Sequence, residues 1–72
     1  MIAKIIFDNG GTETVNNLVE IIQHKSRYSE AKSFDADNLK TFQPSYSHYT
    51  FVGDNIVSVH GSNVHHVTFR PN

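Results

Sequence analysis

The stretch of sequence that decides the fold is SHYTFVGDNIVSVHGSNVHHVTF, residues 47–69. It contains two turn sequences of the same kind, GDN at residues 53–55 and GSN at residues 61–63. A β-branched residue follows each turn, so the stretch predicts three short strands joined by two three-residue loops. We interpret each loop as a type I turn that a left-handed asparagine closes.

Three-residue loops determine which side chains face one another. Val52 then pairs with Ile56, His48 with His60, and His60 with Val64 across the second loop. One side of the predicted meander is apolar and the other polar, and a slip of one residue would turn the apolar set outward, so the separation supports this register. The apolar side holds Tyr49, Phe51, Val57, Val59, Val67 and Phe69, with His65 as its one polar member. The polar side holds His48, Thr50, Ser58, His60, His66 and Thr68, and near the turns also Val52, Ile56 and Val64.

The first residues of the chain predict a further strand. Residues 2–7 are apolar on both sides, which is typical of a central or covered strand. The sequence DNGG at residues 8–11 is a strong turn signal, because Asn-Gly suits a tight hairpin whose two central residues both take positive φ. On this interpretation residues 12–15 form a second strand.

A helix competes with that second strand. Val15, Leu18, Val19 and Ile22 recur at i, i+3, i+4 and i+7, the spacing of an amphipathic helix. We favour a helix over residues 14–24, and a short hairpin before it stays open.

The middle of the chain has no clear period. Residues 26–34 are compatible with an edge strand, and residues 35–41 with one helical turn that ends before Pro44. Residues 1–72 are expected to form a single small α+β domain. In it one main amphipathic helix packs on an antiparallel sheet that begins with the N-terminal strand and ends in a three-stranded meander.

The composition bounds the possible functions. The chain has no cysteine, which excludes disulfides, cysteine zinc sites and thiol chemistry. A net charge of −1 argues against a strong electrostatic nucleic-acid binder. The first apolar run is too short for a signal peptide or a membrane span, so we expect a cytoplasmic protein with no membrane partner. In size the chain is similar to small single-domain proteins of bacteria and their phages, and no motif carries a closer assignment.

The histidines suggest one alternative function. Five of the 72 residues are histidine, and four of them follow residue 47. In the predicted meander His48 lies opposite His60, and His66 lies diagonally from His60. Three imidazoles at this spacing can bind zinc or another transition metal. The competing interpretation is a solvated sheet surface that happens to carry imidazoles.

A second alternative is nucleic-acid binding. The segment that contains Lys25, Arg27, Tyr28 and Lys32 interleaves cations with an aromatic ring, an arrangement that can follow a phosphate backbone and stack bases. Glu30 opposes these cations, and a solvated edge or loop is the simpler interpretation.

The leading expectation is a non-enzymatic protein-binding or accessory module. Its partner is another protein or a second copy of the chain. No catalytic triad or phosphate-binding glycine motif is present in the sequence, so no catalytic residue and no cofactor is expected. Tyrosine is enriched at protein interfaces, and a domain of this size offers open sheet edges to a partner or to itself. The predicted partner-binding residues are Tyr46, His48, Tyr49 and His60.

Overall fold

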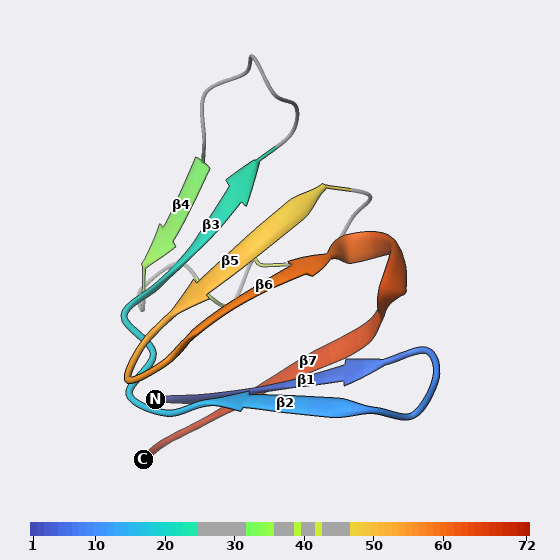
Figure 1. Cartoon of the computed structure of the whole chain (residues 1–72). Helices are drawn as coiled ribbons and strands as arrows, with labels where there is room; N and C mark the ends of the chain where they lie inside the picture. Colours follow the sequence, from blue (N-terminus) through green and yellow to red (C-terminus); the bar gives the residue numbers. More distant parts are fainter. Residues whose placement is uncertain (25–31, 36–38, 40–41, 43–46) are drawn as a thin grey trace.

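The computed structural model describes residues 1–24, 32–35, 39, 42 and 47–72. Its described strands form two antiparallel sheets that face one another (Figure 1). The three-stranded sheet has the order β2-β1-β7, and the four-stranded sheet has the order β4-β3-β5-β6. The strands are β1 Ile2–Phe7, β2 Thr12–Val15, β3 Glu20–His24, β4 Lys32–Asp35, β5 His48–Val52, β6 Ile56–His60 and β7 Val64–Arg70, and the short 3-10 turn η2 spans Gly61–Asn63.

The predicted α+β class is wrong, because the segment expected to form the main helix is extended. Residues 14–24 contain the end of β2, a turn and all of β3. Asn17 takes a left-handed conformation with φ of 52°, which ends regular structure between the two strands. In β3 alternate residues Ile21 and Gln23 are buried, the two-residue period of a strand. Among the described residues, no helix has the length and apolar character that crossing a bilayer requires.

The hairpin that the sequence left open is present. β1 pairs with β2 on one side and with β7 on the other, so the prediction of a central first strand is confirmed. In the loop the Gly10 amide donates to the Phe7 carbonyl at 3.0 Å and the Phe7 amide to the Gly11 carbonyl at 2.9 Å. Gly10 takes the positive φ of 88°, while Asn9 keeps a negative φ, so only one loop residue is left-handed. The Asn9 side-chain oxygen instead accepts a hydrogen bond from the Gly11 amide at 2.8 Å.

The register predicted for the first turn of the meander is confirmed. β5 and β6 pair from Val52 opposite Ile56 to His48 opposite His60. The loop conformation differs, because neither Gly53 nor Asn55 has a positive φ. The Gly53 amide instead donates to the Asn55 carbonyl at 3.0 Å.

The three-stranded meander is wrong at its second turn. Residues 61–63 form η2, which carries the chain from one sheet to the other, and β7 pairs with β1 instead of β6. β7 therefore pairs with the side of β1 that β2 leaves open. Ile6 pairs with His66 and Phe7 with Val64, which leaves His65 as the extra residue of a β-bulge. The bulge exposes His65, the residue that did not fit the predicted apolar side.

The core lies between the sheets, and one aromatic ring is central to it. Phe42 is buried and makes edge-to-face contacts with four rings from β4, β5 and β7, at centroid distances from 5.3 to 6.1 Å. The four rings are Phe34, Tyr49, Phe51 and Phe69. The predicted edge strand over residues 26–34 overlaps β4, and most of that stretch and of the predicted turn at 35–41 lies outside the described residues.

One end of the molecule joins the two sheets tightly. The β5–β6 turn packs on the β2–β3 connection, where the Asp54 amide donates to the Asn16 carbonyl at 2.9 Å. The Asn17 side chain donates to the Asp54 carboxylate at 2.8 Å, and the Asn55 side chain to the Thr14 carbonyl at 3.2 Å. These contacts fix the distance between the sheets at this end.

Candidate functional site

The outer edge of β6 leaves part of the core uncovered. β6 is the last strand of the four-stranded sheet, and its inward residues Val57 and Val59 are only half-buried. The residues opposite them on β5, Phe51 and Tyr49, are only 1% and 2% exposed. The difference arises because β5 has a strand on each side and β6 has one.

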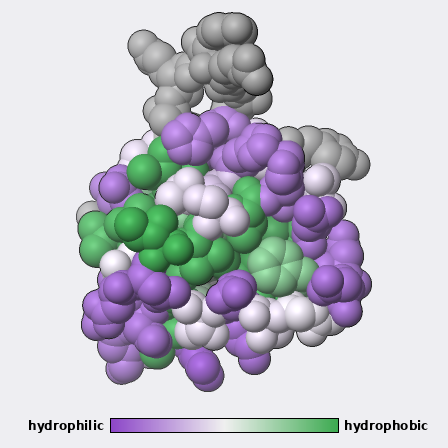
Figure 2. All heavy atoms as spheres, in the orientation of Figure 1, coloured by the Kyte–Doolittle hydropathy of each residue, from purple (hydrophilic) through white to green (hydrophobic). Residues whose placement is uncertain are grey.

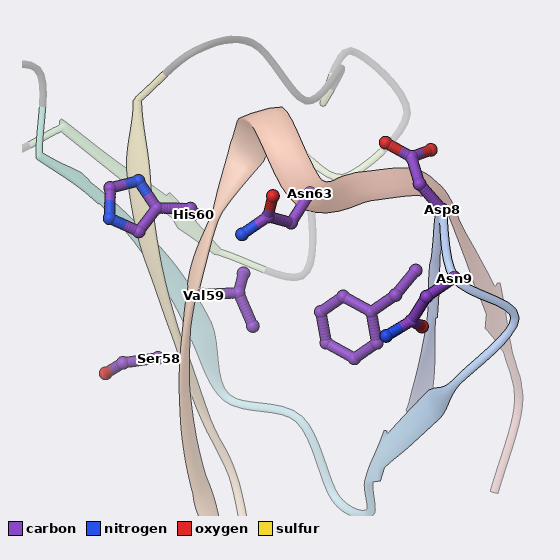
Figure 3. A pocket seen from close by; sticks show the side chains of 7 residues that line it. Asp8, Asn9, Ser58, Val59, His60 and Asn63 are labelled. Carbon is purple, nitrogen blue, oxygen red and sulfur yellow. The ribbon is translucent and has the colours of Figure 1, made fainter.

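A pocket opens beside this edge, at the end of the molecule away from the tight turn contact. Its volume is about 630 Å³. Figure 3 shows Val59 and Asn63 on one side of the pocket and Asn9 on the other, with Ser58 and His60 pointing away from Val59. The Asp8 amide donates to the Asn63 carbonyl at 3.0 Å, which ties the β1–β2 hairpin to η2 at the pocket rim. The lining residues are Phe7, Asp8, Asn9, Ser58, Val59, His60 and Asn63.

The surface around the edge is partly apolar. Figure 2 shows a band of hydrophobic surface that crosses the face seen in Figure 1, with hydrophilic surface above and below it. Among the large hydrophobic residues described, Ile56 and Val19 are the most exposed, at 69% and 63%. Ile56 is the first residue of β6, so apolar surface accompanies the uncovered edge. An apolar patch with a polar border is typical of a binding surface.

The other three edges that the described strands form carry features that oppose strand addition. β2 has four residues and places Glu13 opposite the buried Ile5, which directs a charged residue to the inner side. β4 is equally short and has a charged residue at each end. β7 contains the bulge at His65 and is followed by Pro71. Short strands, inward charges, bulges and proline are the devices that protect an edge from pairing, and β6, with the sequence IVSVH, has none of them.

The structure places the predicted metal ligands in two different sheets. His48 and His60 are opposed as predicted, with ring centroids 3.8 Å apart. His66 lies on β7 of the three-stranded sheet, so the predicted group of His48, His60 and His66 is not brought together. Its Nδ1 lies 2.6 Å from Nδ1 of His65. Among the described residues no group of three or more histidine, aspartate or glutamate side chains is placed to hold a metal ion.

One histidine was missed by the sequence reasoning. His24 lies opposite His48 on the other side of β5, so His24, His48 and His60 form a row across three strands. All three are exposed on the outer side of the four-stranded sheet. The error follows from the helix assignment. The signal that could have corrected it is the β-branched pair Ile21-Ile22 after the Asn16-Asn17 turn sequence.

The remaining predicted site residues have different outcomes. Tyr49 is buried, and its hydroxyl lies 3.5 Å from Nε2 of Gln23, which also donates to Ser47 at 3.1 Å. Its side chain therefore belongs to the core and cannot form part of an exposed partner surface. Tyr46, Lys25, Arg27 and Tyr28 lie outside the described residues, and the backbone of Lys32 begins β4. The nucleic-acid interface stays a prediction.

The chain matches no protein-family model, no curated protein and no solved structure.

Proposed function

We propose that the protein is a non-enzymatic binding module that accepts an extended segment of polypeptide along the outer edge of β6. The observation that supports this most directly is the half-exposure of Val57 and Val59, two inward residues of a strand with no protective feature on its open side. An added strand would cover both side chains and pair the outward-facing backbone groups of β6.

The pocket supplies specificity in this proposal. Alternate side chains of an added strand point inward, and one of them reaches the space beside Val59 and Phe7. Asp8, Asn9 and Asn63 border that space with polar groups, which suits an apolar side chain at the pocket centre and polar atoms at its rim. The expected ligand is therefore an extended segment with apolar residues at alternate positions.

In this proposal His60 keeps the role in partner binding that the sequence predicts, and the added strand is the neighbour that it contacts. It ends β6 and lines the pocket, so it would contact the added strand directly. His48 lies one strand further in and supports His60 through their ring contact.

The test is selection of linear peptides from a phage-displayed random library on the immobilised chain. Selected peptides would be synthesised and titrated by calorimetry against the wild type, Val59→Lys and Thr12→Lys. Lysine at position 59 places a charge on the inner side of the edge, while Thr12 is exposed on the outer side of β2 and serves as the matched control. Circular dichroism would establish that both variants fold.

We expect peptides with alternating apolar residues whose affinity falls at least about tenfold in Val59→Lys, or ~1.4 kcal/mol, and stays within about twofold in Thr12→Lys. Amide chemical-shift changes should concentrate on residues 56–60. Failure of a monomeric chain to enrich any peptide, or equal binding to both variants, would contradict strand addition at β6.

A further inference from the structure

We infer that the segment accepted by β6 is β6 of a second copy of this chain, so that two copies pair edge to edge about a two-fold axis at Ser58. The inference rests on the proposed function, strand addition at this edge, and names its occupant. It follows from the self-complementary sequence of β6, IVSVH.

A two-fold axis that passes through Ser58 relates the two strands in antiparallel order. Ile56 of one copy then lies opposite His60 of the other, Val57 opposite Val59, and Ser58 opposite itself. All five residues of the strand are paired, and the two four-stranded sheets become one continuous sheet. The same surface of both copies is used, which is the closed arrangement of a symmetric dimer.

The inner side of this pairing buries what the single copy leaves half-exposed. Val57 of each copy lies beside Val59 of the other, at the mouth of the pocket that Phe7 and Val59 line. The two-fold axis places the two pockets at opposite ends of the joined strands. Apolar burial contributes roughly 25 cal/mol per Å² removed from water, and inward valines of an edge strand are well placed to supply it.

The outer side is compatible as well. Ile56, the most exposed large hydrophobic residue described, lies against the imidazole of His60 of the second copy. Ser58 faces a second Ser58, and each hydroxyl can both donate and accept a hydrogen bond. The pairing sets no two side chains of like formal charge directly opposite each other.

The edges of the three-stranded sheet do not offer such a pairing. Self-pairing of β2 would bring the exposed Glu13 of both copies to the joined edge, and the bulge in β7 interrupts a regular ladder. A domain of 72 residues also gains proportionally more from association than a large one, because it buries a smaller fraction of its own surface.

The experiment combines sedimentation velocity with cysteine crosslinking in a chain that has no cysteine of its own. Wild type and the folded variants Val59→Lys and Thr12→Lys would be sedimented over a wide concentration range. Single variants Ser58→Cys, Ile56→Cys and His60→Cys would be oxidised under mild conditions, alone and as an equimolar mixture of the last two.

The expected result is a concentration-dependent dimer for wild type and Thr12→Lys, and a monomer for Val59→Lys. Ser58→Cys should crosslink to itself, because opposed Cα atoms lie about 4.5–5.5 Å apart, within disulfide reach. Ile56→Cys alone should not crosslink, since its two copies are four positions, about 13 Å, apart along the strands. The mixture of Ile56→Cys with His60→Cys should crosslink as a mixed dimer.

Two results would overturn the inference. One is a wild-type chain that is monomeric at every concentration, and the other is a dimer that persists in Val59→Lys with no crosslink through Ser58→Cys. A monomer that still binds the selected peptides at β6 would overturn the second copy as occupant and leave the proposed function standing. A monomer that binds no peptide would overturn both.

Discussion

A Cβ atom on Gly53 would stand 2.5 Å from the carbonyl oxygen of Asn16, closer than the 3.0 Å below which Cβ contacts are essentially never found. The β5–β6 turn therefore touches the β2–β3 connection with no space between them. This contact joins the two sheets at one end, and the pocket opens at the other. Glycine is needed at position 53 for this close approach and not for its backbone conformation, because its φ is not positive.

Gly53→Ala is expected to destabilise the fold by about 1–3 kcal/mol, the usual cost of overpacking. The alanine methyl meets backbone oxygens of Asn16 and Asn17, which cannot move independently. Urea denaturation measures the difference. Gly11→Ala is the matched control, because its nearest neighbour, at 3.0 Å, is the oxygen of the exposed Asn9 side chain and not a backbone atom. Equal losses in the two variants would show that the contact at Asn16 is not limiting.

Substitutions at Asn17 separate backbone conformation from hydrogen bonding. The Asn17 side chain donates to Asp54 and accepts from Asn72, both at 2.8 Å, and its φ is 52°. Asn17→Gly keeps the conformation and loses the hydrogen bonds, at a cost of about 0.5–1.5 kcal/mol for each. Asn17→Ala should cost a further ~1–2 kcal/mol, because a Cβ disfavours the left-handed region. Thermal unfolding of both variants checks the order, and an alanine variant as stable as the glycine variant would contradict it.

Phe42→Ala should remove the ring that connects four other aromatic side chains. The expected loss is about 3–5 kcal/mol, a large part of the ~5–15 kcal/mol that stabilises a typical domain. Near-UV circular dichroism should lose its aromatic signal, and the chain should be largely unfolded near body temperature. Phe42→Leu fills part of the space and should retain a cooperative transition. A cooperative, near-native melt of Phe42→Ala would contradict the central place of this ring.

The contact between His65 and His66 makes a prediction about their tautomers. Their Nδ1 atoms lie 2.6 Å apart, so a hydrogen bond between them needs one proton and one lone pair. At alkaline pH one ring should carry its proton on Nδ1 and the other on Nε2. Long-range ¹H–¹⁵N correlation spectra distinguish the two forms. The same tautomer in both rings would rule out a hydrogen bond between these two atoms.

The parts of the fold that depend on local chemistry could be predicted from the sequence. The β5–β6 register follows from loop length and alternation, because a slip would expose Tyr49 and Phe51. The central position of β1 follows from its two apolar sides. Both features can be predicted from patterns of residues that are close together in the chain.

The prediction of a helix over residues 14–24 was wrong because the apolar positions there fit both the helical period of 3.6 residues and the strand period of two. Val15 and Leu18 are buried, as a helical stripe requires, but Val19 is 63% exposed. Leu18 donates its amide to the carbonyl of Met1 at 2.7 Å, a contact between distant positions that no local pattern reports. The turn chemistry of Asn16 and Asn17 was the signal that the periodicity obscured.

The candidate site was beyond local reasoning for a related reason. The two turns at 53–55 and 61–63 look alike, yet only the first returns the chain to the same sheet. Whether β6 is an edge depends on where β7 goes, and that depends on the unfilled side of β1. The row of histidines likewise appears only once β3 is placed beside β5.

The pairing of β1 with β7 has a consequence for the time course of folding. Ile2 lies opposite Arg70, so the three-stranded sheet is built from opposite ends of the chain. Closing so long a loop costs conformational entropy before any contact compensates it, and folds dominated by such pairings form in roughly milliseconds to seconds. The β1–β2 hairpin can form early, but one side of β1 then stays unpaired until β7 docks. During that interval the nascent chain, rather than the finished one, carries the greater risk of aggregation.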